Sequence, residues 1–238
     1  MPWTQYSRNL EDVMLRRALA GVSEGSFLDV GAGHPVYDSN TYALYRRGWR
    51  GIALEPIEEV MALWQQERPE DLLIAMAASA EEGEKVLHVL PDAAQMSTLK
   101  AEYVADRQRE GWRAAARRVP TTTLNAVLDR FHEGELHVMS LDVEGAEREV
   151  LAGLDLSRYR PWIILVEAVL PVTKQPAHDA WEPGLLAASY EYAYFDGVNR
   201  FYLAAEHAAL KEHFASPPGP ADDYVRYPRG DDVEWGRR

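Results

Sequence analysis

Four carboxylate side chains stand at the ends of apolar runs that are typical of buried strands. Asp29 lies in FLDV, Glu55 follows RGIAL, Asp142 follows HVMSL and Glu167 lies in IILVE. Parallel strands are buried on both faces and end at a common edge, where ligands bind. Acids gathered there can accept hydrogen bonds from hydroxyl groups, hold a cation or remove a proton from a hydroxyl. Each acid alone is more often a helix cap or a solvated loop residue, so it is the set of four that indicates a site.

A glycine-rich turn, GAGHP, follows the first of these strands. Gly31 and Gly33 lie in this turn, and Glu55 comes about twenty residues later. In nucleotide-binding sheets, an acid at this spacing accepts hydrogen bonds from the ribose hydroxyls. Glu55 could instead cap the next helix. Val36 replaces the third glycine of a dinucleotide fingerprint, and Asp29 would repel a phosphate. The turn therefore predicts a cofactor with adenosine and an amino acid part but no phosphate, namely S-adenosylmethionine. The residues expected to bind it are Asp29, Gly31, Gly33, Glu55 and Ser79.

The second half of the chain supplies the candidates for catalysis. In LDVEGAEREVL, Asp142 ends a strand, and Glu144 and Glu147 stand where a helix begins. Both glutamates could simply favour the helix N-terminus through its dipole. Asp142 faces the expected crevice, where a carboxylate can take a proton from a hydroxyl or bind Mg²⁺ together with Glu167. A hydrogen-bonded buried acid explains Glu167 equally well. The predicted catalytic residues are Asp142, Glu144 and Glu167, with Asp142 and Glu167 as ligands if a metal is used.

Other polar and aromatic residues fall in loops close to the expected crevice. The residues predicted to contact the second substrate are His34, Ser97, His178, Trp181, Asn199 and Arg200. An aromatic ring beside a crevice suits stacking on a sugar face. Structural roles are open for all of them: His34 could be solvated, Trp181 could pack in the core, and the last two could hold a hairpin turn.

Alternating strand and helix patterns predict the elements that position these residues. Helices are expected over 11–19, 39–47, 57–67, 100–118, 125–131, 145–151 and 179–188. Strands are expected over 27–30, 50–56, 72–79, 85–90 (an extra edge strand), 119–124, 136–143 and 161–170, with a hairpin over 190–205. This order indicates an α/β, doubly wound sheet that is mostly parallel and carries an antiparallel hairpin strand. We expect one domain over 1–238, with a core over about 22–205, an N-terminal helix over 9–21 and a loosely held tail over 214–238.

Composition limits the class of protein. The 238 residues are 47% hydrophobic, enough for one sizeable core. The net charge of -13 argues against nucleic acid or an anionic membrane as a partner. Cysteine is absent, which excludes disulfides, thiolate nucleophiles and cysteine-bound zinc. Because there is neither a signal-peptide pattern nor an apolar run long enough to cross a bilayer, a cytoplasmic protein is expected. A homodimer is the expected assembly.

Five runs cover most of the chain between Phe27 and Ala204: FLDVGAGHPVYDSNTYALYRRGWRGIALEP, VPTTTL, SLDVEGAEREVLAGLDL, RPWIILVEAVLP and FDGVNRFYLA. Together, and in this order, they resemble the FkbM family of S-adenosylmethionine-dependent methyltransferases. The resemblance implies a class I methyltransferase (Rossmann-like) fold. It also implies O-methylation, commonly of a hydroxyl on a sugar or on a glycosylated or polyketide natural product. The partner would then be a small hydroxyl-bearing acceptor.

The resemblance also assigns residues by position. It places Asp29, Gly31 and Glu55 at the cofactor, and Asp142 and Glu144 in or beside the active site. Gly33 departs from the Asn that is common in the family, and both residue types accept unusual backbone angles. Two alternatives are open: a nicotinamide-dependent oxidoreductase, against which Val36 argues, and an inactive partner-binding domain, which would have no need of the four acids.

Overall fold

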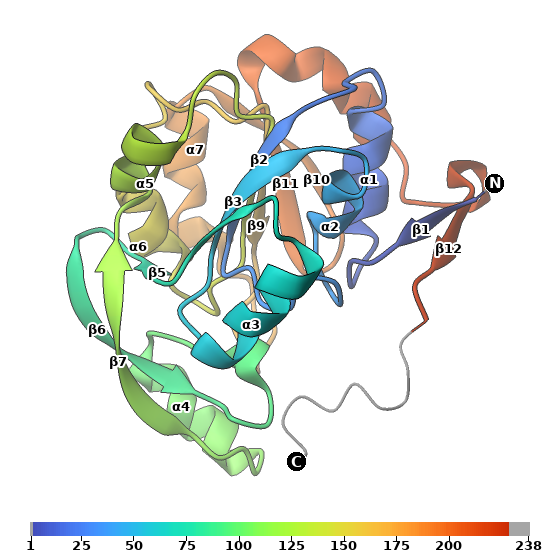
Figure 1. Ribbon diagram of the computed structural model, residues 1–238. Coiled ribbons are helices and arrows are strands. Elements are labelled where there is room, and N and C mark those ends of the chain that lie inside the picture. Colours follow the sequence, from blue (N-terminus) through green and yellow to red (C-terminus); the bar gives the residue numbers. More distant parts are fainter. Residues whose placement is uncertain (1, 229–238) are drawn as a thin grey trace.

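The computed structural model describes residues 2–228, which form a central sheet with helices on both faces (Figure 1). Within these residues the sheet has seven strands in the order β10-β11-β9-β8-β2-β3-β4. They are β2 (Ser26–Val30), β3 (Arg50–Leu54), β4 (Leu72–Ile74), β8 (Val138–Leu141), β9 (Ile163–Glu167), β10 (Tyr190–Phe195) and β11 (Asn199–Ala204). Neighbouring strands from β4 to β9 are parallel, whereas β11 is antiparallel to both β9 and β10. The predicted doubly wound sheet with an antiparallel hairpin strand is confirmed.

Each face of this sheet has its own helices. The helices are α1 (Glu11–Ala18), α2 (Tyr42–Tyr45), α3 (Glu58–Glu67), α4 (Ala101–Arg109), α5 (Leu124–Phe131), α6 (Glu147–Ala152) and α7 (Glu182–Ala187). Leu28 and Met139 pack with α5, α6 and α7 on one face, and Phe27 and Val138 pack with α1 and α2 on the other (Figure 1). Because successive residues of a strand point to opposite faces, strands covered on both sides need continuous apolar runs.

A smaller sheet of three strands, ordered β5-β7-β6 within the described residues, accompanies the main one. Its strands are β5 (Ala77–Ala78), β6 (Gly83–Val89) and β7 (Ala115–Thr122), and a 3-10 turn, η1 (Ala94–Met96), follows β6. The predicted strand over 72–79 is divided, since β4 pairs with β3 and β5 pairs with β7. The segment over 85–90 is an edge strand as predicted, but it belongs to the smaller sheet.

The helix predicted over 100–118 is wrong in its second half. Helix α4 ends before Gly111, whose φ of +93° stops it. The chain then turns, and β7 pairs antiparallel with β6 along the whole of that strand. Alanine and arginine favour helices, but pairing with β6 outweighs their intrinsic preference here.

Two other predicted helices are shorter than expected. The helix over 39–47 is a single turn, α2, whose Tyr42 N–H donates to Ser39 Oγ at 3.1 Å. The helix over 179–188 is divided into η2 (His178–Ala180) and α7, because Trp181 between them has a non-helical φ of -133°. The helices over 11–19, 57–67, 125–131 and 145–151 agree with prediction to within two residues.

Two strands from opposite ends of the described residues pair beside α1. Strand β1 (Trp3–Gln5) pairs in parallel with β12 (Tyr224–Arg226), which follows η3 (Ala205–Phe214) and η4 (Pro220–Asp222) (Figure 1). Arg17 of α1 forms an ion pair with Asp222 at 2.7 Å. The tail is therefore tied down as far as residue 228 rather than loosely held, and the rest of the predicted tail, 229–238, lies outside the described residues. No helix within residues 2–228 is long and apolar enough to cross a membrane.

Candidate active site

Two cavities open side by side at the carboxyl ends of the parallel strands. The first is lined by Gly31, Glu55, Ser97 and Leu99, among others. The second is larger, about 300 Å³, and is lined by His34, Glu167 and Asn199, among others. Residues common to both walls are Gly31, Gly33, Gln95, Asp142 and Glu144. The predicted glycine turn and the predicted catalytic acids therefore meet where the cavities join.

The glycine turn leaves no room for a side chain. A Cβ on Gly31 would lie 1.8 Å from the backbone oxygen of Asp142, and the φ of Gly31 is +74°. Gly33 has a φ of +54°, and its N–H donates to Glu55 Oε2 at 2.9 Å. The indole N–H of Trp64 donates to the Gly33 carbonyl at 2.7 Å. Close packing against Asp142 thus requires glycine at position 31, as the sequence indicated.

Glu55 joins the turn to the following helix. Its Oε1 accepts the N–H of Ile57 at 2.8 Å, just before α3, and its Oε2 accepts that of Gly33. Glu55 therefore caps the start of the following helix, as the alternative interpretation predicted, and its carboxyl group also lines the first cavity. A carboxylate oxygen can accept more than one hydrogen bond, so both oxygens keep capacity for ligand hydroxyls. Burial raises the pKa of Glu55 to about 7.

Two residues predicted to bind the cofactor have partners inside the protein instead. Thr41 Oγ1 donates a hydrogen bond to the Asp29 carboxylate, which is buried in the middle of β2. Ser79 Oγ accepts a hydrogen bond from Lys85 Nζ at 2.7 Å. Neither residue lines either cavity. Their place in the structure is that of buried polar residues that hold neighbouring elements together.

Three carboxyl groups, two of them buried, converge at the junction of the cavities. Oxygens of Asp142, Glu147 and Glu167 lie within 4.8 Å of one another. The Asp142 and Glu167 carboxyl groups are hydrogen-bonded, which requires a proton between them. Burial, and then the neighbouring acids, raises the pKa of Glu167 well above its ordinary range. The Oε2 of Glu167 is buried without a hydrogen-bond partner in the described part of the chain.

Glu147 belongs to this group of acids, and Glu144 lies beside it. Glu147 is the first residue of α6, as the helix-start alternative predicted, but its carboxyl group points inward and accepts the N–H groups of Val143 (3.2 Å) and Gly145 (3.1 Å). Glu144 lines both cavities with a φ of +52°, and Arg107 of α4 donates to its Oε2 at 2.9 Å. Burial raises the pKa of each to about 7.

Three of the predicted substrate residues do reach the cavities. His34 Nδ1 accepts the N–H groups of Val36 and Tyr37, and burial lowers the pKa of His34 to about 4, so its imidazole is neutral. Asn199 Nδ2 donates to Glu11 Oε1 at 2.8 Å. Ser97 lines the first cavity rather than the second.

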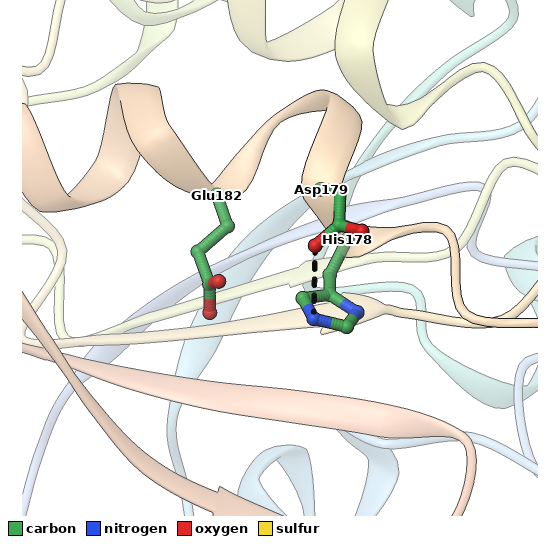
Figure 2. A group of neighbouring side chains, drawn as sticks. All are labelled: His178, Asp179 and Glu182. Carbon is green, nitrogen blue, oxygen red and sulfur yellow. Dashed lines mark ion pairs between the residues drawn. The ribbon is translucent and has the colours of Figure 1, made fainter.

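The other three line neither cavity, and their contact with the second substrate stays a prediction. His178 lies beside Asp179 and Glu182 (Figure 2), with 3.4 Å between His178 Nε2 and Asp179 Oδ1. Trp181 is buried in the core against Tyr202. Arg200 is bound to Glu182 at 2.7 Å and points away from the site that Asn199 faces, because adjacent residues of a strand alternate.

Comparison with known proteins assigns the family. Residues 29–192 match the family described as Methyltransferase FkbM domain. The chain belongs to the FkbM methyltransferase family. It is similar to a TehB-like SAM-dependent methyltransferase from Corynebacterium glutamicum ATCC 13032 Kitasato, with 9% identity, a TM-score of 0.43 and 81% of this chain and 87% of that chain covered. It is also similar to an O-methyltransferase from Bacillus cereus in complex with SAH, with 12% identity, a TM-score of 0.41 and 85% and 82% coverage. No curated protein matches.

The FkbM methyltransferase therefore has a class I, Rossmann-like methyltransferase fold and uses S-adenosylmethionine as methyl donor. Of the predicted cofactor residues, Gly31, Gly33 and Glu55 line the first cavity and can hold it. The nicotinamide alternative receives no support from the comparisons.

Sequence reasoning missed several residues of the FkbM methyltransferase site. Arg8, Glu11 and Lys174 line the second cavity, and Arg107 reaches it through Glu144. Arg8 precedes α1, Glu11 is the first residue of α1, and Lys174 lies in a loop. No local sequence pattern therefore marks any of them as part of the site. Glu147 carried a signal, since it stands five residues after Asp142 beside a Val-Glu-Gly turn.

Proposed function

We propose that this methyltransferase transfers the methyl group to a hydroxyl oxygen, on a sugar or on a glycosylated or polyketide natural product. The observation that carries the proposal is the hydrogen-bonded pair of Asp142 and Glu167, of which Asp142 lines both cavities. A hydroxyl in the second cavity would lie next to a carboxylate that also borders the methyl donor. A hydroxyl is a weak nucleophile at neutral pH and needs such a base.

In this mechanism the acceptor oxygen attacks the methyl carbon while Asp142 takes the hydroxyl proton. The carbon–sulfur bond breaks, its electron pair stays on sulfur, and S-adenosylhomocysteine leaves. Burial raises the pKa of Asp142, which makes its carboxylate a stronger base than an exposed one. Glu167 orients Asp142 through their hydrogen bond. Holding oxygen, carbon and sulfur in line supplies much of the acceleration in reactions of this kind.

The same acids would also fit Mg²⁺. Carboxylate oxygens are its preferred protein ligands, and three of them lie within 4.8 Å here. Asp142 and Glu167 would hold the ion in place of their shared proton, and the buried, unpartnered Oε2 of Glu167 is suited to this. A bound ion would acidify the acceptor hydroxyl. This second arrangement keeps the same substrate class and differs in its dependence on metal.

The test is calorimetric titration with S-adenosylhomocysteine, followed by methyl transfer from labelled donor to a panel of sugars and glycosides, with Mg²⁺ or with a chelator. We expect one-to-one cofactor binding, transfer to oxygen, and a loss of about 10²–10⁴-fold in rate for Asp142→Asn with cofactor binding retained. Glu149→Gln, on the outer side of α6, is the matched control and should keep full rate. Full turnover by Asp142→Asn would exclude Asp142 as the base, and loss of activity in chelator would favour the metal arrangement.

A further inference from the structure

The rim of the second cavity carries two cationic side chains that the reaction itself does not use. Arg8 comes from the segment before α1, and Lys174 comes from the loop after β9. Both are exposed, and neither side chain forms a hydrogen bond or an ion pair with another residue among 2–228. They are brought to one rim from positions 166 residues apart in the chain. Two unpaired cations on one wall are unusual in a protein with a net charge of -13.

The acids of this wall already have partners of their own. Glu144 is paired with Arg107 at 2.9 Å, and Glu11 accepts a hydrogen bond from Asn199 at 2.8 Å. Asp142 and Glu167 share a proton. Asp38, the remaining acid of the wall, also has interactions, and His34 is neutral. Arg8 and Lys174 attract the Asp142 carboxylate, and Lys174 also attracts Glu144 and Glu167, but among residues 2–228 neither cation forms an ion pair with these acids. Both side chains can therefore still bind an incoming anion.

The loop that presents Lys174 is held in an unfavourable conformation. Val172 and Lys174 have φ values of +66° and +57°, a region that residues with a Cβ rarely adopt, β-branched ones least of all. Backbone bonds fix the loop: Leu170 N–H donates to Gln175 O at 2.7 Å, and Lys174 N–H to Leu170 O at 3.1 Å. Such strain persists where the surrounding structure imposes it, and it is concentrated at ligand sites.

Arg8 is held equally firmly. The buried Asp12 carboxylate accepts the Tyr6 N–H at 2.7 Å and the Ser7 hydroxyl at 2.6 Å, and Glu11 Oε2 accepts the Asn9 N–H at 2.7 Å. These hydrogen bonds hold the backbone of residues 6–12 in one conformation beside the second cavity. The backbone that carries each cation is thus fixed before any ligand arrives, which lowers the backbone entropy lost on binding.

We propose that the acceptor carries an oxyanion group, a carboxylate or a phosphate, which Arg8 and Lys174 bind at the rim while its hydroxyl lies beside Asp142. This inference rests on the proposed O-methyltransferase function and narrows its substrate class to acidic hydroxyl compounds. Arginine suits planar, two-point binding of an oxyanion and lysine adds a point charge. A neutral acceptor would gain hydrogen bonds from these side chains but no attraction between opposite charges.

The test is calorimetric titration of the protein saturated with S-adenosylhomocysteine, at constant ionic strength. The acceptor-independent probes are inorganic phosphate and acetate, and the matched sugars are glucose, glucuronate and glucose 1-phosphate. We expect saturable one-to-one binding of phosphate or acetate, and binding of the acidic sugars at least ten times tighter than that of glucose. Preference for phosphate over acetate would assign a phosphorylated acceptor, and the reverse preference a carboxylate.

The double variant Arg8→Gln/Lys174→Gln should lose the anion binding at least tenfold while keeping affinity for S-adenosylhomocysteine, because neither residue lines the first cavity. The variant Arg8→Gln/Lys174→Gly removes the same charges but places glycine where φ is positive, so its backbone is not strained. It should lose anion binding to the same extent, which would show that the loss does not come from misfolding. Arg118→Gln, on β7, is the control for a lost surface charge and should bind as the wild type does.

Equal anion binding by the wild type and the double variant, or no anion binding by cofactor-loaded wild type, would overturn the inference and leave the methyltransferase function standing. Failure of the wild type to bind S-adenosylhomocysteine would instead contradict the proposed function, and this inference with it.

Discussion

At the scale of single residues, the site depends on two positions where chemistry and backbone geometry coincide. Gly31 permits close contact between the glycine turn and Asp142, and Glu55 ties Gly33 to the start of α3. Neither residue contacts the acceptor in the proposed mechanism. Both shape the cavity that receives the methyl donor.

Gly31→Ala should abolish cofactor binding. The added Cβ would collide with the Asp142 backbone oxygen, and the φ of +74° is itself unfavourable for alanine. Gly48→Ala is the matched control, because Gly48 has a φ of +93° with nothing within 4 Å of an added Cβ. We expect Gly48→Ala to lose only ~1–2 kcal/mol of stability and to bind S-adenosylhomocysteine normally. Normal binding by Gly31→Ala would contradict the assigned contact.

Glu55→Gln should weaken S-adenosylhomocysteine binding about tenfold or more, because an ionised carboxylate accepts ribose hydroxyls more strongly than an amide oxygen does. Burial raises the pKa of Glu55 to about 7, so wild-type affinity should rise between pH 6 and pH 8 as the carboxylate ionises. Calorimetry across this range should show the rise in the wild type and a flat profile in the variant. A flat wild-type profile would remove Glu55 from the cofactor site.

At the scale of elements, a buried arginine connects the strands that carry the cofactor turn. Arg68, at the end of α3, pairs with Asp71 at 2.7 Å with both side chains fully buried, and it donates to Thr41 Oγ1 at 3.0 Å. Thr41 in turn holds Asp29 of β2, and Asp71 accepts the Gly51 N–H of β3 at 2.8 Å. This network explains why Asp29 is turned away from the cavities.

Arg68→Ala should destabilise the protein by ~3–5 kcal/mol, because it leaves buried carboxylates without a counterion. Arg50→Ala is the comparison, since Arg50 pairs with Glu70 at the surface and should contribute less than ~1 kcal/mol. Urea denaturation of both variants gives the two free energies of unfolding. Equal losses would mean that the Arg68 network carries no special stability.

The segment that contains η1 covers the first cavity. Gln95, Ser97 and Leu99 line it, and the cavity measures only about 50 Å³, whereas pockets for small ligands usually hold ~300–1,000 Å³. We expect residues 94–99 to move outward to admit the cofactor and then to close again. Thr98 Oγ1 donates to the Glu144 carbonyl at 2.7 Å, which connects this movement to the acids at the junction of the cavities.

Hydrogen exchange should detect that movement. Adding S-adenosylhomocysteine should slow amide exchange over residues 90–99 and leave β1 and β12 unchanged, because those strands lie beside α1 and not at the cavity. Unchanged exchange over 90–99 in protein that binds the cofactor would show that the cavity opens by another route.

At the scale of the whole molecule, buried acids set the response to pH. Burial raises the pKa values of Asp12 and Asp29 to about 6, of Glu55, Glu144 and Glu147 to about 7, and of Glu11 to about 8. Between the ordinary and the raised pKa, the folded state binds more protons than the unfolded state. Stability must then fall as the pH rises through that window.

We expect the free energy of unfolding to decrease by at least ~2 kcal/mol between pH 5.5 and pH 8, since one acid raised from 4.5 to about 7 accounts for about that much. Chemical denaturation at several pH values measures the slope. Glu147→Gln removes one such group and should flatten the slope, whereas Glu149→Gln, at the surface, should not. A free energy of unfolding that increases toward pH 8 would contradict the raised pKa values of these buried acids.

The sequence by itself determined the sheet, the glycine turn and the meeting of Asp142, Glu144 and Glu167. These follow from short-range rules: parallel strands need apolar runs, glycine is favoured where φ is positive, and residues after parallel strands share one edge. Glu55 could be predicted for the same reason. The helix over 125–131 and the hairpin over 190–205 were marked by equally local patterns.

Only the tertiary structure decided which way individual side chains face and which distant residues meet. Asp29 turns toward Thr41 and Arg68, and Trp181 enters the core, because partners from other elements compete for them. Residues 115–118 form a strand because β6 is beside them. Arg8 and Lys174 reach one rim through the path of the whole chain. The spacing of apolar residues predicts which face of a helix or strand is buried. The segment that packs against that face is decided by contacts between parts of the chain that are far apart in sequence.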